Sequence, residues 1–302
     1  MNSYELRSHF ALIIAMVLWG SSFIALKVAV TEMNPMVVVF IRMAIGAMAF
    51  AVVWPWLRQQ FRYQSGDWKY LLGMALFEPC LYFIFEAQAL KYTSAGQAGM
   101  VTAMLPLMVA IAAFFFLKES NSKRQWFGFM LAVVGVVIMT LTGEDSTQAP
   151  NAILGNVLEF LAMCSAVGYT LLVKHLVSRY PAFLLTALQS FVGTAFFLPF
   201  ALFADWPESI SLELMSVLIY LGLVISLGAY GLYNFSLTHL KASTAAGYTN
   251  LLPVFSLAFS VVLLDEHIVL AQWGAIVLVF AGVALTGERP RKTAEVPPAV
   301  TG

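Results

Sequence analysis

The sequence predicts an all-α integral membrane protein with ten transmembrane helices, arranged as two inverted five-helix repeats. Three observations predict this class: the composition, ten long apolar segments, and a similarity between the two halves of the chain. Of the 302 residues, 61% are hydrophobic and 11% are charged, whereas soluble domains average about 45–50% apolar and about 25% charged residues. This composition excludes nearly every soluble enzyme. The net charge of +0 gives no indication of a nucleic-acid partner.

Ten apolar segments of about 18–25 residues follow one another, and about 20 helical residues cross the apolar core of a bilayer. The breaks between them carry Pro, Gly, Asn and Ser, the residues that typically end helices. The predicted spans are 10–30, 35–57, 68–90, 94–117, 124–142, 153–175, 181–204, 213–237, 242–264 and 270–287. The tail 290–302 contains Pro and charged residues and is expected to be a disordered cytoplasmic segment.

The distribution of Lys and Arg predicts the orientation. With the N-terminus in the cytoplasm, thirteen of the 16 Lys and Arg residues lie in inner loops or termini, Lys27 and Lys91 lie near the outer side, and Arg42 lies within a span. Cytoplasmic loops carry such an excess of basic residues. Both termini are therefore predicted to be cytoplasmic, in a bacterial inner membrane. Lys27 is expected to extend its amine to the outer membrane surface.

The two halves resemble each other at an offset of 147 residues. The matching positions are Pro106 with Pro253, Gln125-Trp126 with Gln272-Trp273, Gly135 with Gly282, and Arg42 with Gln189. We therefore predict a first repeat over 1–147 and a second over 148–289. Because each repeat has an odd number of spans, the second enters the membrane inverted. Inverted repeats are typical of secondary transporters, whose halves rock around one site near the membrane midplane.

The motifs Trp19-Gly20-Ser21-Ser22-Phe23, Phe40-Ile41-Arg42, and Pro106 with Glu119 before Gln125-Trp126-Phe127-Gly128 resemble the EamA-type, ten-helix branch of the drug/metabolite transporter superfamily. The resemblance covers essentially the whole chain. It implies a central cavity formed by spans 1–4 and 6–9, with spans 5 and 10 more peripheral. It also implies export of amino acids, related metabolites or drugs, commonly driven by protons. Gln189 stands where the first half has Arg42, so a strictly symmetric site is not expected.

Ionisable residues within spans are functional candidates, because each costs about 2.5–3.5 kcal/mol on insertion scales. Glu78 lies near the middle of the third span, and Pro79 after it frees a backbone carbonyl. Glu78, Tyr82 and Glu86 follow at a helical spacing that places them along one face. We predict substrate-binding roles for all three and proton coupling at Glu78 and Glu86. The alternative is that Arg42 neutralises Glu78 in a purely structural role.

Three further residues have two interpretations each. Arg42 either binds a substrate carboxylate or pairs with an acidic side chain. Trp19, deep within the first span, either meets a substrate ammonium group through a cation–π contact or packs between helices. Glu159 in the sixth span either faces the cavity or bonds a neighbouring helix.

Polar uncharged residues in the spans are also predicted to bind substrate. The alternative is that they join helices, at about 0.6 kcal/mol per hydrogen bond. Pro106 and Pro253 are predicted hinges. The glycines at 128, 135, 274 and 282 suit either a homodimer contact on spans 5 and 10 or packing within one chain. The predicted uncharged substrate-binding residues are Gln97, Gln189, Tyr230, Asn234, Tyr248 and Asn250.

These observations predict a secondary active transporter that exports small amino-acid-like metabolites by alternating access with proton coupling. Its expected partners are the substrate, protons and membrane lipids, with no cofactor and no metal. The main alternative is an importer or exchanger of sugar-like or phosphorylated metabolites, although only Arg42 lies deep in a span. A channel or an intramembrane enzyme is disfavoured, because the spans contain no Asp and no His-Glu-x-x-His motif.

Overall fold

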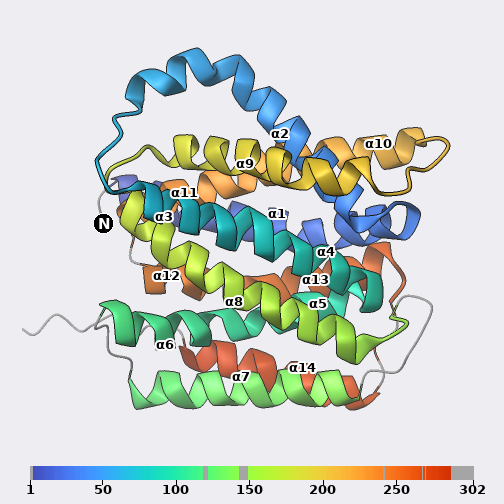
Figure 1. Cartoon of the computed structure of the whole chain (residues 1–302). Coiled ribbons are helices and arrows are strands. Elements are labelled where there is room, and N and C mark those ends of the chain that lie inside the picture. The colour runs from blue at the N-terminus through green and yellow to red at the C-terminus, as the bar shows by residue number, and fades with distance from the viewer. Residues whose placement is uncertain are drawn as a thin grey trace, which may run out of the picture.

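The computed structural model describes residues 3–117, 122–142, 149–240, 242–266, 268 and 270–286. Within these residues every regular element is a helix, and the helices run side by side in one bundle (Figure 1). The predicted all-helical membrane class is therefore confirmed. Glu119 and the predicted tail 290–302 lie outside the described residues.

The helices of the first half begin with α1 (Ser3–Glu32) and α2 (Pro35–Leu57), and those of the second with α8 (Ala152–Leu176) and α9 (Ala182–Leu202). The other elements of the first half are η1 (Arg58–Gln60), α3 (Trp68–Ala75), η2 (Leu76–Leu81), α4 (Tyr82–Tyr92), α5 (Ala95–Val101), η3 (Thr102–Met104), α6 (Leu105–Leu117) and α7 (Lys123–Leu141). Those of the second half are α10 (Leu212–Ile219), η4 (Tyr220–Ala229), α11 (Tyr230–His239), α12 (Ala242–Tyr248), η5 (Thr249–Leu251), α13 (Leu252–Leu263) and α14 (Leu270–Thr286).

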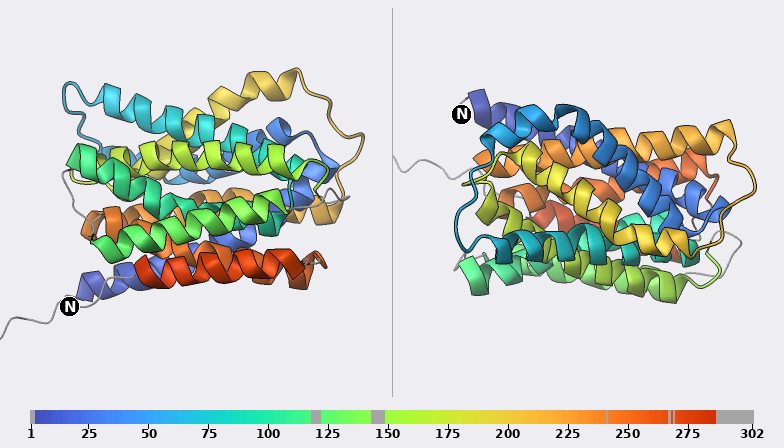
Figure 2. Two further views of the ribbon diagram at one scale, coloured as in Figure 1. Left: turned by 90° about the horizontal axis from the view of Figure 1, so that it is seen from below. Right: turned by 45° about the horizontal axis from the view of Figure 1, so that its top comes forward.

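Eight helical segments of the described chain are long and apolar enough to cross a membrane, and Trp273–Gly282 is a shorter apolar helix. The chain is thus an integral, multi-pass membrane protein. The predicted fifth and tenth spans correspond to α7 and α14, which lie together at one edge of the bundle (Figures 1 and 2). The total of ten membrane crossings stays a prediction.

The corresponding membrane-spanning helices of the two halves are interrupted at corresponding places. The 3-10 turns η3 and η5 begin at Thr102 and Thr249, 147 residues apart, and each lies shortly before one of the predicted hinge prolines, Pro106 or Pro253. The π-helical segments η2 and η4 interrupt the third and eighth predicted spans. A π-helical or 3-10 stretch within a helix often marks a functional hinge, but the hinge roles of the prolines stay predictions.

Two lysines, the buried Lys27 and the partly buried Lys174, stabilise helix ends in the same way in each half. The Lys27 amine donates to the carbonyl oxygens of Leu90 at 2.7 Å and Thr93 at 3.0 Å, at the end of α4. Exactly 147 positions later in each case, the Lys174 amine donates to the carbonyls of Leu237 at 2.8 Å and Leu240 at 2.6 Å, at the end of α11. These bonds satisfy carbonyls that a helix leaves unpaired. The prediction that Lys27 extends to the surface was wrong, since its exposed fraction is 5%.

Glycines bring α7 and α14 into close contact. A Cβ atom at Gly282 would lie 2.5 Å from the carbonyl oxygen of Gly128, and one at Gly135 would lie 2.8 Å from the carbonyl oxygen of Ala275. Of the two interpretations of these glycines, close packing within the chain therefore accounts for Gly135 and Gly282.

The two halves interlock across the centre of the bundle. In the first half α1 packs on α11 and α13, while in the second half α8 packs on α4 and α6, and α2 packs on α9. Because helices from both halves alternate in this way, the space between them is lined by both.

Gly282→Ala is expected to lower the free energy of unfolding by about 1–3 kcal/mol, because the added methyl group meets backbone on α7. Gly274→Ala is the matched control on the same helix, since a Cβ atom there meets nothing within 4 Å among the described residues. Thermal unfolding of the purified variants in detergent measures the difference. Equal melting temperatures for the two variants would contradict the close α7–α14 contact.

Candidate functional site

A small cavity of about 40 Å³ lies at the centre of the bundle. A volume of this size holds a few water molecules, since one water needs about 10–15 Å³. Seven of the predicted spans, from both halves of the chain, contribute to its wall. The described residues that line it are Trp19, Ser22, Phe23, Arg42, Glu78, Tyr82, Glu86, Thr102, Leu105, Met163, Ala166, Tyr169, Thr170, Tyr230, Tyr233, Thr249 and Leu252.

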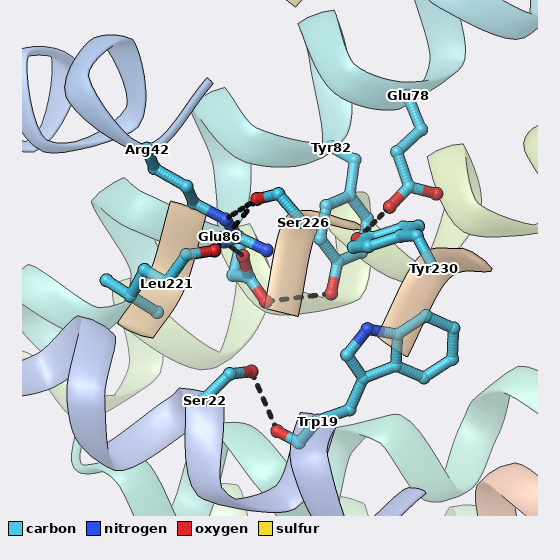
Figure 3. A network of polar contacts seen from close by, with 9 residues as sticks. All are labelled: Trp19, Ser22, Arg42, Glu78, Tyr82, Glu86, Leu221, Ser226 and Tyr230. Carbon is cyan, nitrogen blue, oxygen red and sulfur yellow. Dashed lines mark hydrogen bonds and ion pairs between the residues drawn. The ribbon is translucent and has the colours of Figure 1, made fainter. Parts of the chain in front are cut away.

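Glu78 reaches the cavity from a break in the third predicted span. Its backbone is extended, with φ −151° and ψ 118°, inside an otherwise helical stretch. The cause is local, because Pro79 disfavours the helical conformation of the residue before it. The carboxylate accepts a hydrogen bond from the Tyr230 hydroxyl across the cavity (Figure 3). The break therefore places an ionisable group and its backbone carbonyl at mid-bundle.

Arg42 and Glu86 form a buried ion pair, with Nη1 and Oε2 separated by 3.6 Å. The Arg42 Nε–H donates to the Ser226 hydroxyl at 2.8 Å, and the guanidinium lies 4.3 Å from the centre of the Phe83 ring. The Tyr82 hydroxyl donates to the other carboxylate oxygen of Glu86 at 2.8 Å (Figure 3). The pair is therefore held from three sides, by α2, α4 and η4.

The second half supplies uncharged hydrogen-bonding groups. The Tyr169 hydroxyl lies 3.0 Å from Gln189 Oε1 and 2.8 Å from Asn234 Oδ1. Asn234 also donates to the Thr186 hydroxyl at 3.1 Å, and the Gln189 amide donates to the Glu78 carbonyl at 3.5 Å. Gln189 and Asn234 thus stand behind the cavity wall, where they orient Tyr169 and the broken backbone at Glu78.

Three buried polar atoms at the cavity have no hydrogen-bond partner in the described part of the chain. They are Trp19 Nε1, Arg42 Nη1 and Glu86 Oε2. The indole ring of Trp19 packs edge-on against Tyr230, with ring centres 5.0 Å apart, and its nitrogen is on the side where Tyr82 and Glu86 lie (Figure 3). Arg42 Nη1 and Glu86 Oε2 are the two atoms of the ion pair, too far apart at 3.6 Å for a hydrogen bond. Because buried polar groups are nearly always hydrogen-bonded, the three atoms indicate a missing hydrogen-bond partner.

Of the eleven predicted substrate-binding residues, the six named Trp19, Arg42, Glu78, Tyr82, Glu86 and Tyr230 line the cavity. The other five lie elsewhere. Gln97 sits in a buried cluster with Thr93 and accepts a hydrogen bond from Asn156 at 3.0 Å. The Tyr248 hydroxyl is 2.7 Å from Nδ1 of His9, and Asn250 is buried beside the lining residue Thr249.

Sequence reasoning did not select Ser226, Phe83 or Tyr169. Ser226 accepts from Arg42 and donates to the Leu221 carbonyl at 3.0 Å, a contact that depends on the π-helical geometry of η4. A signal for it existed, since Ser226 precedes Tyr230 by one helical turn on the face that meets the cavity. Phe83 gave no signal, because one more Phe in an apolar span is indistinguishable from a packing residue.

A bundle of apolar helices with a buried, charged cavity between two interlocked halves is typical of a membrane transporter. The chain belongs to the EamA-like transporter family, whose model matches residues 6–141 and again residues 153–287. The predicted family is thereby confirmed. The two matches cover nearly all of both halves.

Relatives and a solved structure agree with this assignment. An uncharacterized transporter of Archaeoglobus fulgidus is 29% identical over 95% of this chain and 98% of its own length. A probable amino-acid metabolite efflux pump of Salmonella typhimurium is 27% identical over 95% of this chain and 97% of its own length. A crystal structure with 18% sequence identity covers 92% of this chain and 95% of its own, with a TM-score of 0.66, and supports the fold.

Arg42→Met is expected to destabilise the protein by about 3–5 kcal/mol, because it leaves the Glu86 carboxylate buried without its cation. The double variant Arg42→Met/Glu86→Gln is expected to recover much of that loss, since no uncompensated charge remains. Thermal unfolding in detergent compares the two. If the double variant melts at the same temperature as the single one or below it, Arg42 does not act by neutralising Glu86.

Proposed function

We propose that the protein is a secondary active transporter that exports small zwitterionic, amino-acid-like metabolites by alternating access, in exchange for protons. The observation that carries this proposal is the set of buried polar atoms around the central cavity that make no hydrogen bond to a described residue. The Salmonella relative's description as a probable amino-acid metabolite efflux pump supports the direction and the substrate class.

The three atoms that lack a hydrogen bond match the two charges of an amino acid. Arg42 Nη1 and Trp19 Nε1 are hydrogen-bond donors, and together they suit a substrate carboxylate. Glu86 Oε2 is an acceptor and suits an ammonium group. A zwitterion would thus satisfy all three groups, whereas a phosphorylated metabolite would require more buried cations than the Arg42 side chain provides among the described lining residues.

Aromatic side chains form the rest of the substrate's surroundings. Trp19 lies between Tyr230 and Tyr233, with ring centres 5.0 Å from each. Phe23 and Phe83 add apolar surface on the first-half side. These rings favour an apolar or aromatic substrate side chain and bring π-faces near the ammonium group.

Proton coupling follows from competition for the same carboxylates. A substrate ammonium group is attracted to Glu86 and Glu78 only when they are ionised, and a proton on either group removes that attraction. Protons that reach the cavity from one side therefore release the substrate there, and proton release on the other side restores the site. The two repeats, 1–147 and 148–289, are the proposed rocking units, with hinges at Pro106 and Pro253.

Export requires the predicted orientation. With both termini in the cytoplasm of a bacterial cell, the basic loops remain inside, as the distribution of Lys and Arg favours. Protons then enter along the gradient that the inner membrane maintains, while the substrate leaves.

Glu78→Gln is expected to abolish amino-acid transport driven by a pH gradient but to retain exchange of amino acid for amino acid, because exchange requires no net proton movement. The measurement uses proteoliposomes and labelled proteinogenic amino acids. Glu213→Gln is the matched control, since Glu213 is exposed in the first turn of α10. Full pH-driven transport by Glu78→Gln would refute its coupling role.

Trp19→Phe keeps an aromatic ring but removes the indole N–H. A hydrogen bond to a charged group contributes about 1.5–3 kcal/mol, so the KM for an amino acid is expected to rise about tenfold or more. The KM for the corresponding amine, which lacks the carboxylate, should not change. Trp54→Phe is the control, because Trp54 packs on Phe191 and is absent from the described cavity lining. An equal effect on both compounds would contradict carboxylate recognition by Trp19.

A further inference from the structure

Glu159 is a buried acidic residue that the proposed transport cycle does not yet use. Its exposed fraction is 0%, and neither carboxylate oxygen has a hydrogen-bond partner among the described residues. An ionised carboxylate in such surroundings is costly unless a donor or a cation compensates it. A residue that serves only helix packing has no need of this group, since Leu or Met would fill the same space.

The position of Glu159 on α8 connects two polar regions. One helical turn further along the same face, Met163 lines the central cavity. About one turn earlier, Asn156 is buried with Thr93 and Gln97; the Thr93 hydroxyl donates to its oxygen at 2.8 Å, and its amide donates to Gln97 at 3.0 Å. Glu159 therefore lies between the cavity and this polar cluster at the end of the bundle.

The titratable groups that face Glu159 come from α4, which packs directly against α8. They are Glu86 and Tyr82, whose side chains are joined by a hydrogen bond of 2.8 Å. Arg42 on α2 compensates Glu86 and not Glu159, and the Lys27 amine on α1 is held by the carbonyls at the end of α4. Two carboxylates that interact without a shared cation are not readily ionised together.

We propose that Glu159 is a second proton-carrying residue, which takes a proton from the side of the polar cluster of Thr93, Gln97 and Asn156 and passes it to Glu86. Water must bridge both steps, because neither Glu159 oxygen makes a hydrogen bond to a described residue. This inference rests on the proposed proton-coupled function and extends it by a proton route separate from the substrate route. In the transfer, the O–H bond of the Glu159 carboxyl group breaks, bridging water takes up this proton and gives one up, and an O–H bond forms at the Glu86 carboxylate. Glu159 becomes a carboxylate and takes its next proton from water at the cluster's end of the bundle.

The route has a clear consequence for the transport cycle. Buried side chains fill the end of the bundle around Asn156, with exposed fractions of 0% for Thr93, 7% for Gln97 and 3% for Asn156. An amino acid cannot pass there in this conformation, but a proton can move along hydrogen-bonded side chains and the water that bridges them to Glu159. Glu86 is thereby protonated, and the ammonium group displaced, before that end of the bundle opens.

Glu159→Gln tests the proposal in proteoliposomes that contain a mixture of proteinogenic L-amino acids and a pH-sensitive dye. We expect pH-driven amino-acid transport and the accompanying proton flux to fall about 100-fold, while amino-acid exchange and binding affinity remain as in the wild type. Glu159→Asp, which keeps the carboxyl group, should restore part of the proton flux. Glu213→Gln serves again as the control.

The other outcomes are distinct. If Glu159→Gln keeps wild-type proton flux, or if it loses exchange together with pH-driven transport, the relay is overturned while the proposed function stands. If the wild-type protein itself shows no amino-acid-dependent proton flux, the proposed coupling fails and the relay fails with it.

An infrared measurement on the purified protein needs no substrate. The carbonyl-stretch band of protonated carboxylic acids should be smaller in Glu159→Gln than in the wild type and unchanged in Glu213→Gln. An unchanged band in Glu159→Gln would overturn the claim that Glu159 holds a proton.

Discussion

The rest of the structure depends on the requirement that charges buried in an apolar bundle be compensated inside the protein. The membrane interior supplies no water to solvate Arg42 or Glu86, and both are nearly inaccessible, with exposed fractions of 2% and 4%. Their partners come from three elements, and Ser226 belongs to the opposite half of the chain. The same contacts that make the charges tolerable therefore join the two halves around the cavity.

The architecture of the halves is symmetric, whereas the chemistry of the site is not. Lys27 and Lys174 close equivalent helix ends at the same offset of 147 residues. Arg42, however, corresponds to Gln189, which binds Tyr169 and the Glu78 backbone through an uncharged amide. An uncharged amide avoids the desolvation cost of burying a second charge in the same cavity. One half supplies charge, and the other supplies neutral hydrogen bonds that fix its position.

Much of the fold and part of the site could be predicted from the sequence. Long apolar segments and the cost of burying charge identify the spans and single out Arg42, Glu78 and Glu86. The distances between helices could not be predicted in this way, because the helical period only indicates which residues share a face of one helix. Tyr248 and Gln97 met the same sequence criterion as Tyr230, yet they lie outside the cavity wall. Glu78 reaches the cavity through a broken helix, and not by the regular helical spacing with Tyr82 and Glu86 that the sequence suggested.

The sequence by itself determined the membrane class, the family, the repeat and the presence of buried charges, because each depends on composition, local order or similarity along the chain. Only the tertiary structure decided which charges pair, which buried polar atoms make no hydrogen bond to a described residue, and that Lys27 binds backbone carbonyls. These outcomes depend on how α2, α4, α8 and α11 approach one another. That approach is set by the packing of small and aromatic side chains between helices, and no pattern within a single helix contains it.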